Sequence, residues 1–201
     1  MAYFEYGEKE TGYLKSRDKK LGEAIDRIGF VKREIIPDPF CALIYSIVGQ
    51  QVSGKAADTV FSRLTAKAGG ITPEKLVKLE PAEIQNCGMS ARKAGYIRGI
   101  TEAALTGAVD FDNLHKKSDN EIINILTRLN GVGVWTAEML LIFSLGRPDV
   151  LSFNDFGIRK GIMKLYGINE LTREKFSEYR SIYSPYCTTA SIYLWEIAGG
   201  S

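Results

Sequence analysis

The sequence has very few of the side chains that usually hold transition metals. Its three cysteines, Cys41, Cys87 and Cys187, lie far apart, and His115 is the single histidine. No two cysteines have the short spacing of a zinc or iron–sulfur ligand set. This composition argues against a divalent metal centre and a four-cysteine cluster. It fits a reducing, intracellular setting.

Long apolar runs are also missing. The longest, residues 134–145, is shorter than the ~20 residues that a membrane-spanning helix needs, and it contains Glu138. The first fifteen residues, MAYFEYGEKETGYLK, lack the apolar segment of a signal peptide. We therefore expect a soluble, cytoplasmic protein with no contact with a membrane.

Neither sign of charge dominates. The 201 residues include 26 basic and 24 acidic side chains, so the formal net charge is +2. Such a balance permits a polyanionic partner without demonstrating one. The length allows one substantial core or two small ones, and 45% of the residues are hydrophobic, as in ordinary globular proteins.

Alternating apolar and polar residues, the pattern of a half-buried strand, are absent over any useful length. Helical patterns instead fill residues 38–69, with a break near residues 49–54, and continue in residues 90–107, 118–129, 134–145, 154–167 and 172–198. Pro73 and Pro81 stand where two short helices begin, and Ser118 with Glu121 has capping-box spacing. We predict one all-α unit of about ten short helices.

Two glycines one residue apart, Gly131 and Gly133, separate the helical segments 118–129 and 134–145. Such glycines allow a tight turn and leave the amides at the start of the second helix uncovered. Those amides and the positive end of the helix dipole suit a phosphate. The alternative is a purely structural corner with Trp135 in the core. Taken alone, the motif predicts binding to a nucleic-acid backbone and not catalysis.

An acidic residue follows Trp135 by twenty positions, in the segment GRPDVLSFNDFGIRKG. Asp155 stands where an apolar helical pattern begins. It or Asn154 could simply cap that helix. Two cap-type residues stand side by side, however, and only one can cap. A carboxylate in apolar and aromatic surroundings is also the group needed to stabilise a developing cation or to orient a water molecule.

Taken together, these segments resemble the helix–hairpin–helix DNA glycosylases, specifically the 3-methyladenine DNA glycosylase II branch. The resemblance rests on the stretch from LNGVGVWTAEM to NDFGI, on SIVGQQVSGKAA (46–57), on MSARKAGYI (89–97) and on YSPYCTTASIYLW (183–195). It covers roughly residues 38–198. It implies a compact helical core in which two lobes, about 38–145 and 1–37 plus 146–201, flank an active-site cleft, with the hairpin motif at about 120–145.

The resemblance implies a role for each matching residue. Asp155 corresponds to the catalytic aspartate, and Trp135, Trp195 and Met139 correspond to residues of the base pocket. For Trp195 the alternative is a plain core residue. Met139 stands where some relatives have an aromatic side chain, which leaves the substrate range open.

Further residues match the positions that bind DNA in this family. They are Gln50 and Gln51, in the segment that enters the duplex, and Gly131, Gly133 and Thr136 at the hairpin. Alternatively, the two glutamines are ordinary residues on the surface of a helix. The resemblance also places the carbonyls of Thr127, Leu129 and Val132 where relatives bind a monovalent cation. We expect no divalent metal and no nucleotide cofactor.

The chain departs from the family pattern at three positions that matter. Members with lyase activity carry a lysine where this chain has Trp135, so the nucleophile for a covalent imine is missing. Tyr183 and Cys187 stand where many relatives have tryptophan and arginine, so local phosphate contacts or packing differ.

The sequence therefore predicts a monofunctional DNA glycosylase. It would act as a monomer with the chromosome, excise alkylated purines such as 3-methyladenine from damaged duplex DNA in base excision repair, and leave an abasic site. One alternative is a non-catalytic DNA-binding module, which would need the glycines but not Asp155 or the tryptophans. Another is a sister glycosylase for an oxidised or mispaired base, which would be expected to have lysine at position 135 or further recognition segments.

Overall fold

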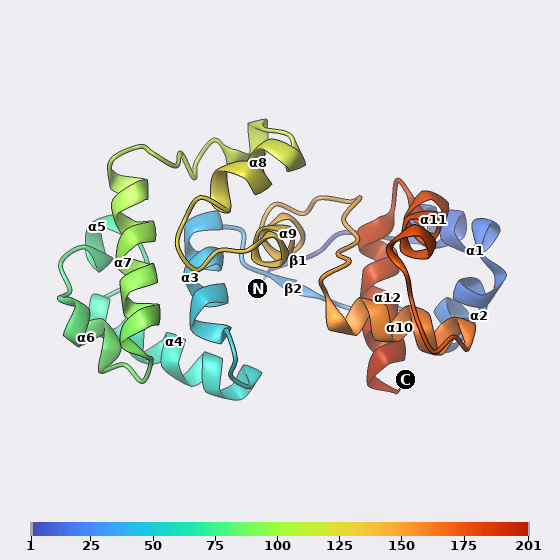
Figure 1. The fold of residues 1–201 in the computed structure, drawn as a ribbon, viewed down its shortest axis with the longest axis horizontal. Coiled ribbons are helices and arrows are strands. Elements are labelled where there is room, and N and C mark those ends of the chain that lie inside the picture. The colour runs from blue at the N-terminus through green and yellow to red at the C-terminus, as the bar shows by residue number, and fades with distance from the viewer. Residues whose placement is uncertain (1, 201) are drawn as a thin grey trace. The chain divides into compact units, whose positions relative to one another are not determined.

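The computed structural model describes residues 2–200, and nearly all of their regular secondary structure is helical (Figure 1). Twelve α-helices and one 3₁₀ helix lie within this range. The strands found there, β1 (Ala2–Tyr3) and β2 (Glu34–Ile35), form one short antiparallel ladder. The predicted all-α class is confirmed. The ladder was not predicted, because two residues are too few to show an alternating pattern.

The chain folds as two compact groups of helices. The middle unit is Ile36–Leu140, and the terminal unit joins the chain up to Ile35 with the chain from Leu141 onward. Within residues 2–200, no helix has the length and hydrophobicity that crossing a membrane requires.

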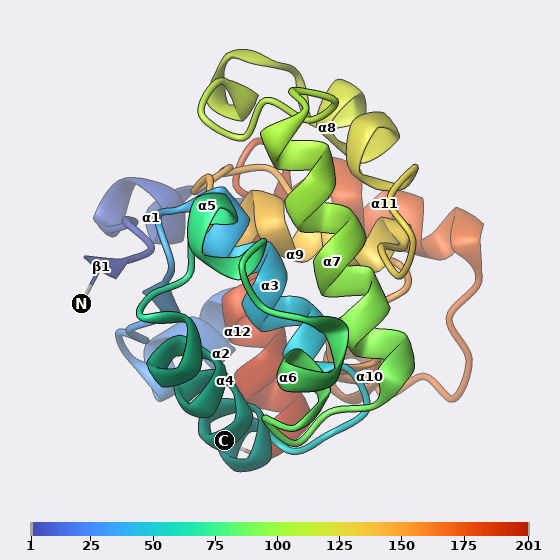
Figure 2. The ribbon, with the colours of Figure 1, turned by 90° about the vertical axis from the view of Figure 1, so that its left-hand side faces the viewer.

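In the middle unit, α7 (Ala91–Leu105) packs against α3 (Pro39–Gly49), α5 (Pro73–Leu76) and α6 (Pro81–Gln85), as Figure 2 shows. Helix α4 (Gly54–Ala68) packs against α3. The 3₁₀ helix (Leu114–Lys116) and α8 (Asp119–Leu126) follow, and α9 (Val134–Phe143) begins here. Several predicted starts are confirmed: prolines open α5 and α6, and Ser118 with Glu121 forms a capping box on α8.

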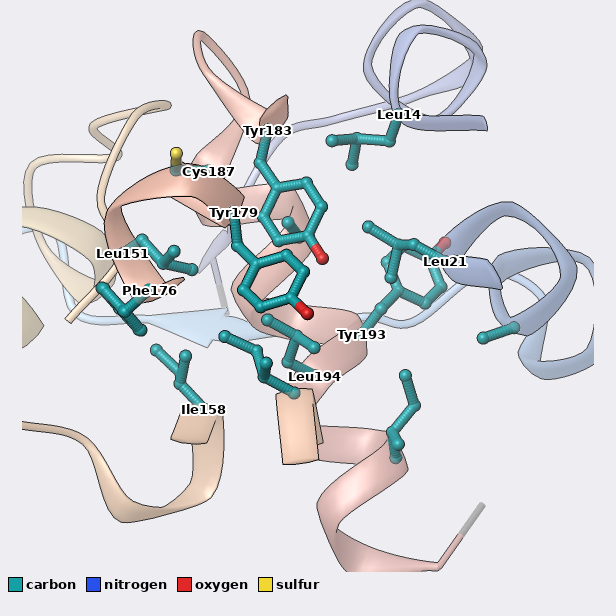
Figure 3. Packing of buried hydrophobic residues seen from close by; sticks show 14 of the residues in the cluster. Leu14, Leu21, Leu151, Ile158, Phe176, Tyr179, Tyr183, Cys187, Tyr193 and Leu194 are labelled. Carbon is teal, nitrogen blue, oxygen red and sulfur yellow. The ribbon is translucent and has the colours of Figure 1, made fainter. Parts of the chain in front are cut away.

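In the terminal unit, α12 (Cys187–Gly199) is the central helix. It packs against α1 (Glu8–Arg17), α2 (Lys19–Ile28), α10 (Phe156–Tyr166) and α11 (Arg173–Tyr183). Ten of its residues are buried, so it is covered on nearly every side. Tyr193 and Leu194 of α12 join Leu14, Leu21, Ile158 and the α11 tyrosines in one apolar cluster (Figure 3).

Helices α10 and α12 approach each other closely at Gly161. A Cβ atom added there would lie 2.2 Å from the carbonyl oxygen of Leu194, much closer than van der Waals contact allows. The absence of a side chain at this position therefore sets the spacing of the two helices. That spacing matters because α10 begins at Asp155 and α12 carries Trp195.

Candidate active site

Asp155 is the N-cap of α10. Its Oδ1 accepts a hydrogen bond from the Ile158 amide at 2.8 Å, whereas the neighbouring Asn154 is exposed. The capping role considered from the sequence is therefore real. An N-cap normally lies at the surface, yet only 7% of Asp155 is exposed. Burial of a carboxylate needs further hydrogen-bond donors, and the structure supplies one.

That second donor is the indole of Trp195. Its Nε1 lies 2.9 Å from the same Oδ1 of Asp155, forty residues away in the chain. Two donors that converge on one oxygen fix the plane of the carboxylate. Trp195 is half-buried at the edge of the terminal-unit core. It is thus more than a core residue, because its polar edge orients Asp155.

Trp195 is itself held by two neighbours in the terminal unit. Phe143 stacks on it with ring centroids 5.5 Å apart, and the Arg33 guanidinium lies 5.8 Å from the indole centroid. Arg33 also forms a 2.6 Å salt bridge with Glu196 on the same helix. These contacts restrict the indole to the orientation that reaches Asp155.

Gly157 provides the space for this arrangement. A Cβ atom there would lie 2.7 Å from Cδ1 of Trp195 and 3.1 Å from Oδ1 of Asp155. No role was predicted for Gly157 from the sequence. The available signal was a glycine inside the first turns of a helix, where it lowers helix propensity and therefore suggests a packing reason.

The hairpin turn connects α8 to α9. Thr127 is the C-cap of α8, and the Val132 amide donates to the Leu129 carbonyl at 3.1 Å. The first bond of α9 runs from the Ala137 amide to the Gly133 carbonyl, at 3.1 Å. The amides of the first turn therefore point out of the helix end, where the dipole is positive.

The two hairpin glycines have different reasons to be glycine. Gly131 has φ +86°, and a Cβ atom there would lie 2.3 Å from the ring of Tyr96, so the protein itself requires glycine. At Gly133 a Cβ atom would meet nothing within 4 Å, and φ is not positive. No contact inside the protein explains Gly133, which fits a position that an outside group approaches.

Three predicted residues lie on α9. Trp135 is 41% exposed, and Met139, one helical turn further on, is buried. Thr136 is only 4% exposed, so its side chain is unsuited to a direct DNA contact. If Thr136 contacts DNA, the contact is made by its main-chain amide. The base-pocket role of Trp135 and Met139 stays a prediction.

The carbonyls suggested for a monovalent cation all belong to the turn between α8 and α9. The Leu129 oxygen accepts one hydrogen bond, from Val132, and a carbonyl has a second lone pair for a cation. This geometry is compatible with the suggested ligand set of Thr127, Leu129 and Val132. Cation binding there stays a prediction.

Gln50 and Gln51 follow the end of α3, so neither lies on a helix surface. The Gln50 side chain donates from Nε2 to the Gly131 carbonyl at 2.8 Å. Gln51 is exposed and has φ +59°, a left-handed conformation that non-glycine residues seldom adopt. The two glutamines therefore differ: Gln50 is bound to the hairpin turn, and Gln51 is presented to solvent.

The two departures near the C-terminus are buried in the terminal-unit core (Figure 3). The Tyr183 hydroxyl lies 2.8 Å from that of Tyr166, and the Cys187 amide donates to Asp149 at 3.3 Å. Burial raises the pKa of the Cys187 thiol, and a hydrogen bond with Asp149 raises it further. Both residues therefore contribute packing, and neither offers a surface for phosphate.

The family of the chain follows from comparison with known proteins. The model of the HhH-GPD superfamily of base excision DNA repair proteins matches residues 44–185. The chain belongs to this superfamily. The match includes the Gln50 loop, the hairpin and Asp155. Arg33 and Trp195, described above, lie outside the matched residues.

Several relatives within the superfamily are similar over most of their length. DNA-3-methyladenine glycosylase 1 of Schizosaccharomyces pombe is 34% identical over 79% of this chain and 72% of its own. A crystal structure of a DNA-3-methyladenine glycosidase from Bacillus halodurans has a TM-score of 0.87 and 38% identity; the match covers 100% of this chain and 94% of the other. The structure of a Schizosaccharomyces pombe 3-methyladenine DNA glycosylase in complex with abasic DNA has a TM-score of 0.84 and 31% identity; the match covers 94% of this chain and 95% of the other.

The hydrogen bonds to Asp155 predict how its substitutions affect stability. Asp155→Asn keeps an oxygen that can accept from both donors, so the free energy of unfolding should change by less than about 1 kcal/mol. Asp155→Ala leaves both donors unsatisfied and should cost about 2–4 kcal/mol. Urea denaturation followed by circular dichroism measures both values. Asn154→Ala, on the exposed neighbour, is the control and should be nearly neutral. Equal losses for Asn and Ala would show that the carboxylate charge, not the hydrogen bonds, holds this site together.

Proposed function

We propose that this chain is a monofunctional DNA glycosylase that removes alkylated purines, such as 3-methyladenine, from duplex DNA in base excision repair. The observation that carries the proposal is the buried Asp155 carboxylate, fixed by Trp195 and the start of α10 in a superfamily of base excision repair proteins. The names of the relatives, at 31–38% identity, support the choice of alkylated purines.

The substrate chemistry explains why one carboxylate is enough. Alkylation at N3 or N7 gives the purine a positive charge, so it leaves with the electron pair of the C1′–N bond and needs no proton. Positive charge then develops on the sugar. Asp155 stabilises that charge and orients a water, whose oxygen bonds to C1′ while its proton passes to solvent. Because two hydrogen bonds already fix the carboxylate, little reorganisation is needed at the moment of reaction.

Recognition of the base falls to aromatic surfaces. The target nucleotide must leave the stack, which costs a few kcal/mol and less when damage has weakened its pairing. The exposed indole of Trp135 offers a π-face to a cationic purine, an attraction of about 0.5–2 kcal/mol that normal neutral bases lack. The attraction of the indole for a positively charged base and the easier extrusion of a weakly paired base both favour alkylated purines over normal ones.

The DNA backbone is held at the hairpin. Gly133 leaves open space beside the first-turn amides of α9, and a phosphate can approach them closely. Main-chain contacts of this kind explain how a chain of net charge +2 binds a polyanion. A monovalent cation at the Thr127, Leu129 and Val132 carbonyls, a monomeric state, and action in the cytoplasm with the chromosome complete the proposal.

Release of the free base tests this function. The protein is incubated with randomly methylated duplex DNA in a chelator, and chromatography identifies the liberated bases. We expect methylated purines above the enzyme-free rate, because nothing in the proposed step needs a divalent metal. DNA binding without release would favour a non-catalytic module. Release from oxidised or mispaired DNA alone would favour the sister activity.

The absence of a lysine at position 135 predicts the state of the product. A lysine nucleophile would form an imine with the sugar and permit strand cleavage, but an indole cannot. The DNA should therefore remain intact at the abasic site until alkali is added, and borohydride present during turnover should trap no protein–DNA adduct. Lys160 and Lys164, beyond Asp155, are the lysines to examine by mass spectrometry. Efficient trapping at either one would overturn the monofunctional assignment.

A further inference from the structure

Helix α7 contacts two loops that lie far apart in the sequence. Lys93 and Tyr96 are three residues apart, so they lie on the same side of the helix. The Lys93 ammonium donates to the Val48 carbonyl at 2.8 Å and to the Gln50 carbonyl at 2.5 Å. The Tyr96 ring packs against Gly131 so closely that a Cβ atom there would lie 2.3 Å away.

The two loops are also joined directly. The Gln50 side chain donates to the Gly131 carbonyl at 2.8 Å, across 81 residues of sequence. The loop of residues 50–53 and the hairpin turn of residues 129–133 are thus linked through Gln50 and, separately, through α7. The segment MSARKAGYI, which carries Lys93 and Tyr96, has no other assigned role in the proposed reaction.

The Lys93 side chain is partly withdrawn from water. Burial lowers the pKa of this lysine, and the nearby Arg92 lowers it further. Its charge is compensated by carbonyls at the C-terminal end of α3, where the helix dipole is negative. The loop that begins there holds Gln51 in a left-handed conformation with its side chain exposed. Such strained conformations persist only where the surrounding contacts enforce them.

We propose that Lys93 is a positioning residue that holds the loop of residues 50–53 against the hairpin turn, so that phosphate binding and entry of this loop into the duplex occur as one step. The inference rests on the proposed function and on the entry into the duplex that the resemblance implies for this loop. Without the Lys93 side chain the hairpin still binds the backbone, but the loop is no longer ordered in advance and must become ordered during binding.

The experiment separates loop entry from DNA binding. The probe is a duplex with a tetrahydrofuran abasic-site analogue and 2-aminopurine beside it, whose fluorescence rises when neighbouring bases are unstacked. Anisotropy of the same duplex, labelled at one end, gives the dissociation constant. Neither readout requires catalysis, so the lesion preference of the protein does not affect the result.

Three variants are compared with the wild type. Lys93→Met removes both donated hydrogen bonds, and Lys93→Arg restores a donor. Lys75→Met is the matched control, because Lys75 donates to the Gly69 carbonyl at 2.6 Å, at the end of α4 in the same unit. It therefore resembles Lys93 in chemistry and differs in not contacting either loop.

We expect Lys93→Met to bind within about threefold of the wild type while the fluorescence rise falls to less than about half. Lys93→Arg should recover most of the rise, and Lys75→Met should match the wild type. An unchanged rise with Lys93→Met, or an equal fall with Lys75→Met, would overturn the inference. If Lys93→Met does not fold, Lys93→Gln, whose shorter side chain cannot reach both carbonyls, takes its place and should show the same reduced rise. A wild-type protein that neither binds nor unstacks this duplex would count against the proposed function instead.

Discussion

The hydrogen bond from the Trp195 indole to Asp155 places demands on much of the terminal unit. For Nε1 to reach Oδ1, the start of α10 must lie against α12, and any side chain at Gly157 or Gly161 would collide with α12. Helix α12 must also be held on its other sides, as it is by α1, α2 and α11. The core of this unit therefore serves to fix one carboxylate.

The middle unit meets a different constraint, which under the proposed function is to present main-chain amides to a phosphate. Gly131 gives the turn its shape under the Tyr96 ring, and Gly133 leaves the amides beyond it open. Lys93 and Gln50 then tie the neighbouring loop to this turn. The proposed binding groups and the proposed reacting carboxylate thus belong to separate units.

Much of this could be predicted from local sequence. Capping residues and prolines gave the starts of α5, α6 and α8, because these signals act within one helical turn. The two adjacent cap-type residues pointed to Asp155 for a similar reason. The Trp195–Asp155 hydrogen bond, the space at Gly157 and the role of Lys93 join residues distant in sequence. They depend on how the helices pack, which the periodicity of apolar residues in the sequence does not predict.

The glutamine pair shows the same limit within one loop. The resemblance treats Gln50 and Gln51 alike, because adjacent identical residues have the same local signal. Tertiary contacts separate them: the Gln50 side chain is bound to the Gly131 carbonyl, and Gln51 is exposed with a positive φ. The β1–β2 ladder was likewise missed, because it depends on the pairing of residues 2–3 with residues 34–35.

In the proposed function, the charge of Asp155, held in place by the Trp195 indole and the Ile158 amide, stabilises the sugar cation. This role is tested by comparing wild type and Asp155→Asn in single-turnover excision from duplex DNA with one methylated purine, alongside binding to the same DNA. The amide keeps the shape and the acceptor oxygen but has no charge to stabilise the sugar cation. We expect binding within about threefold of the wild type and excision slower by at least about 100-fold. Excision at the wild-type rate would contradict it and would reduce Asp155 to a helix cap.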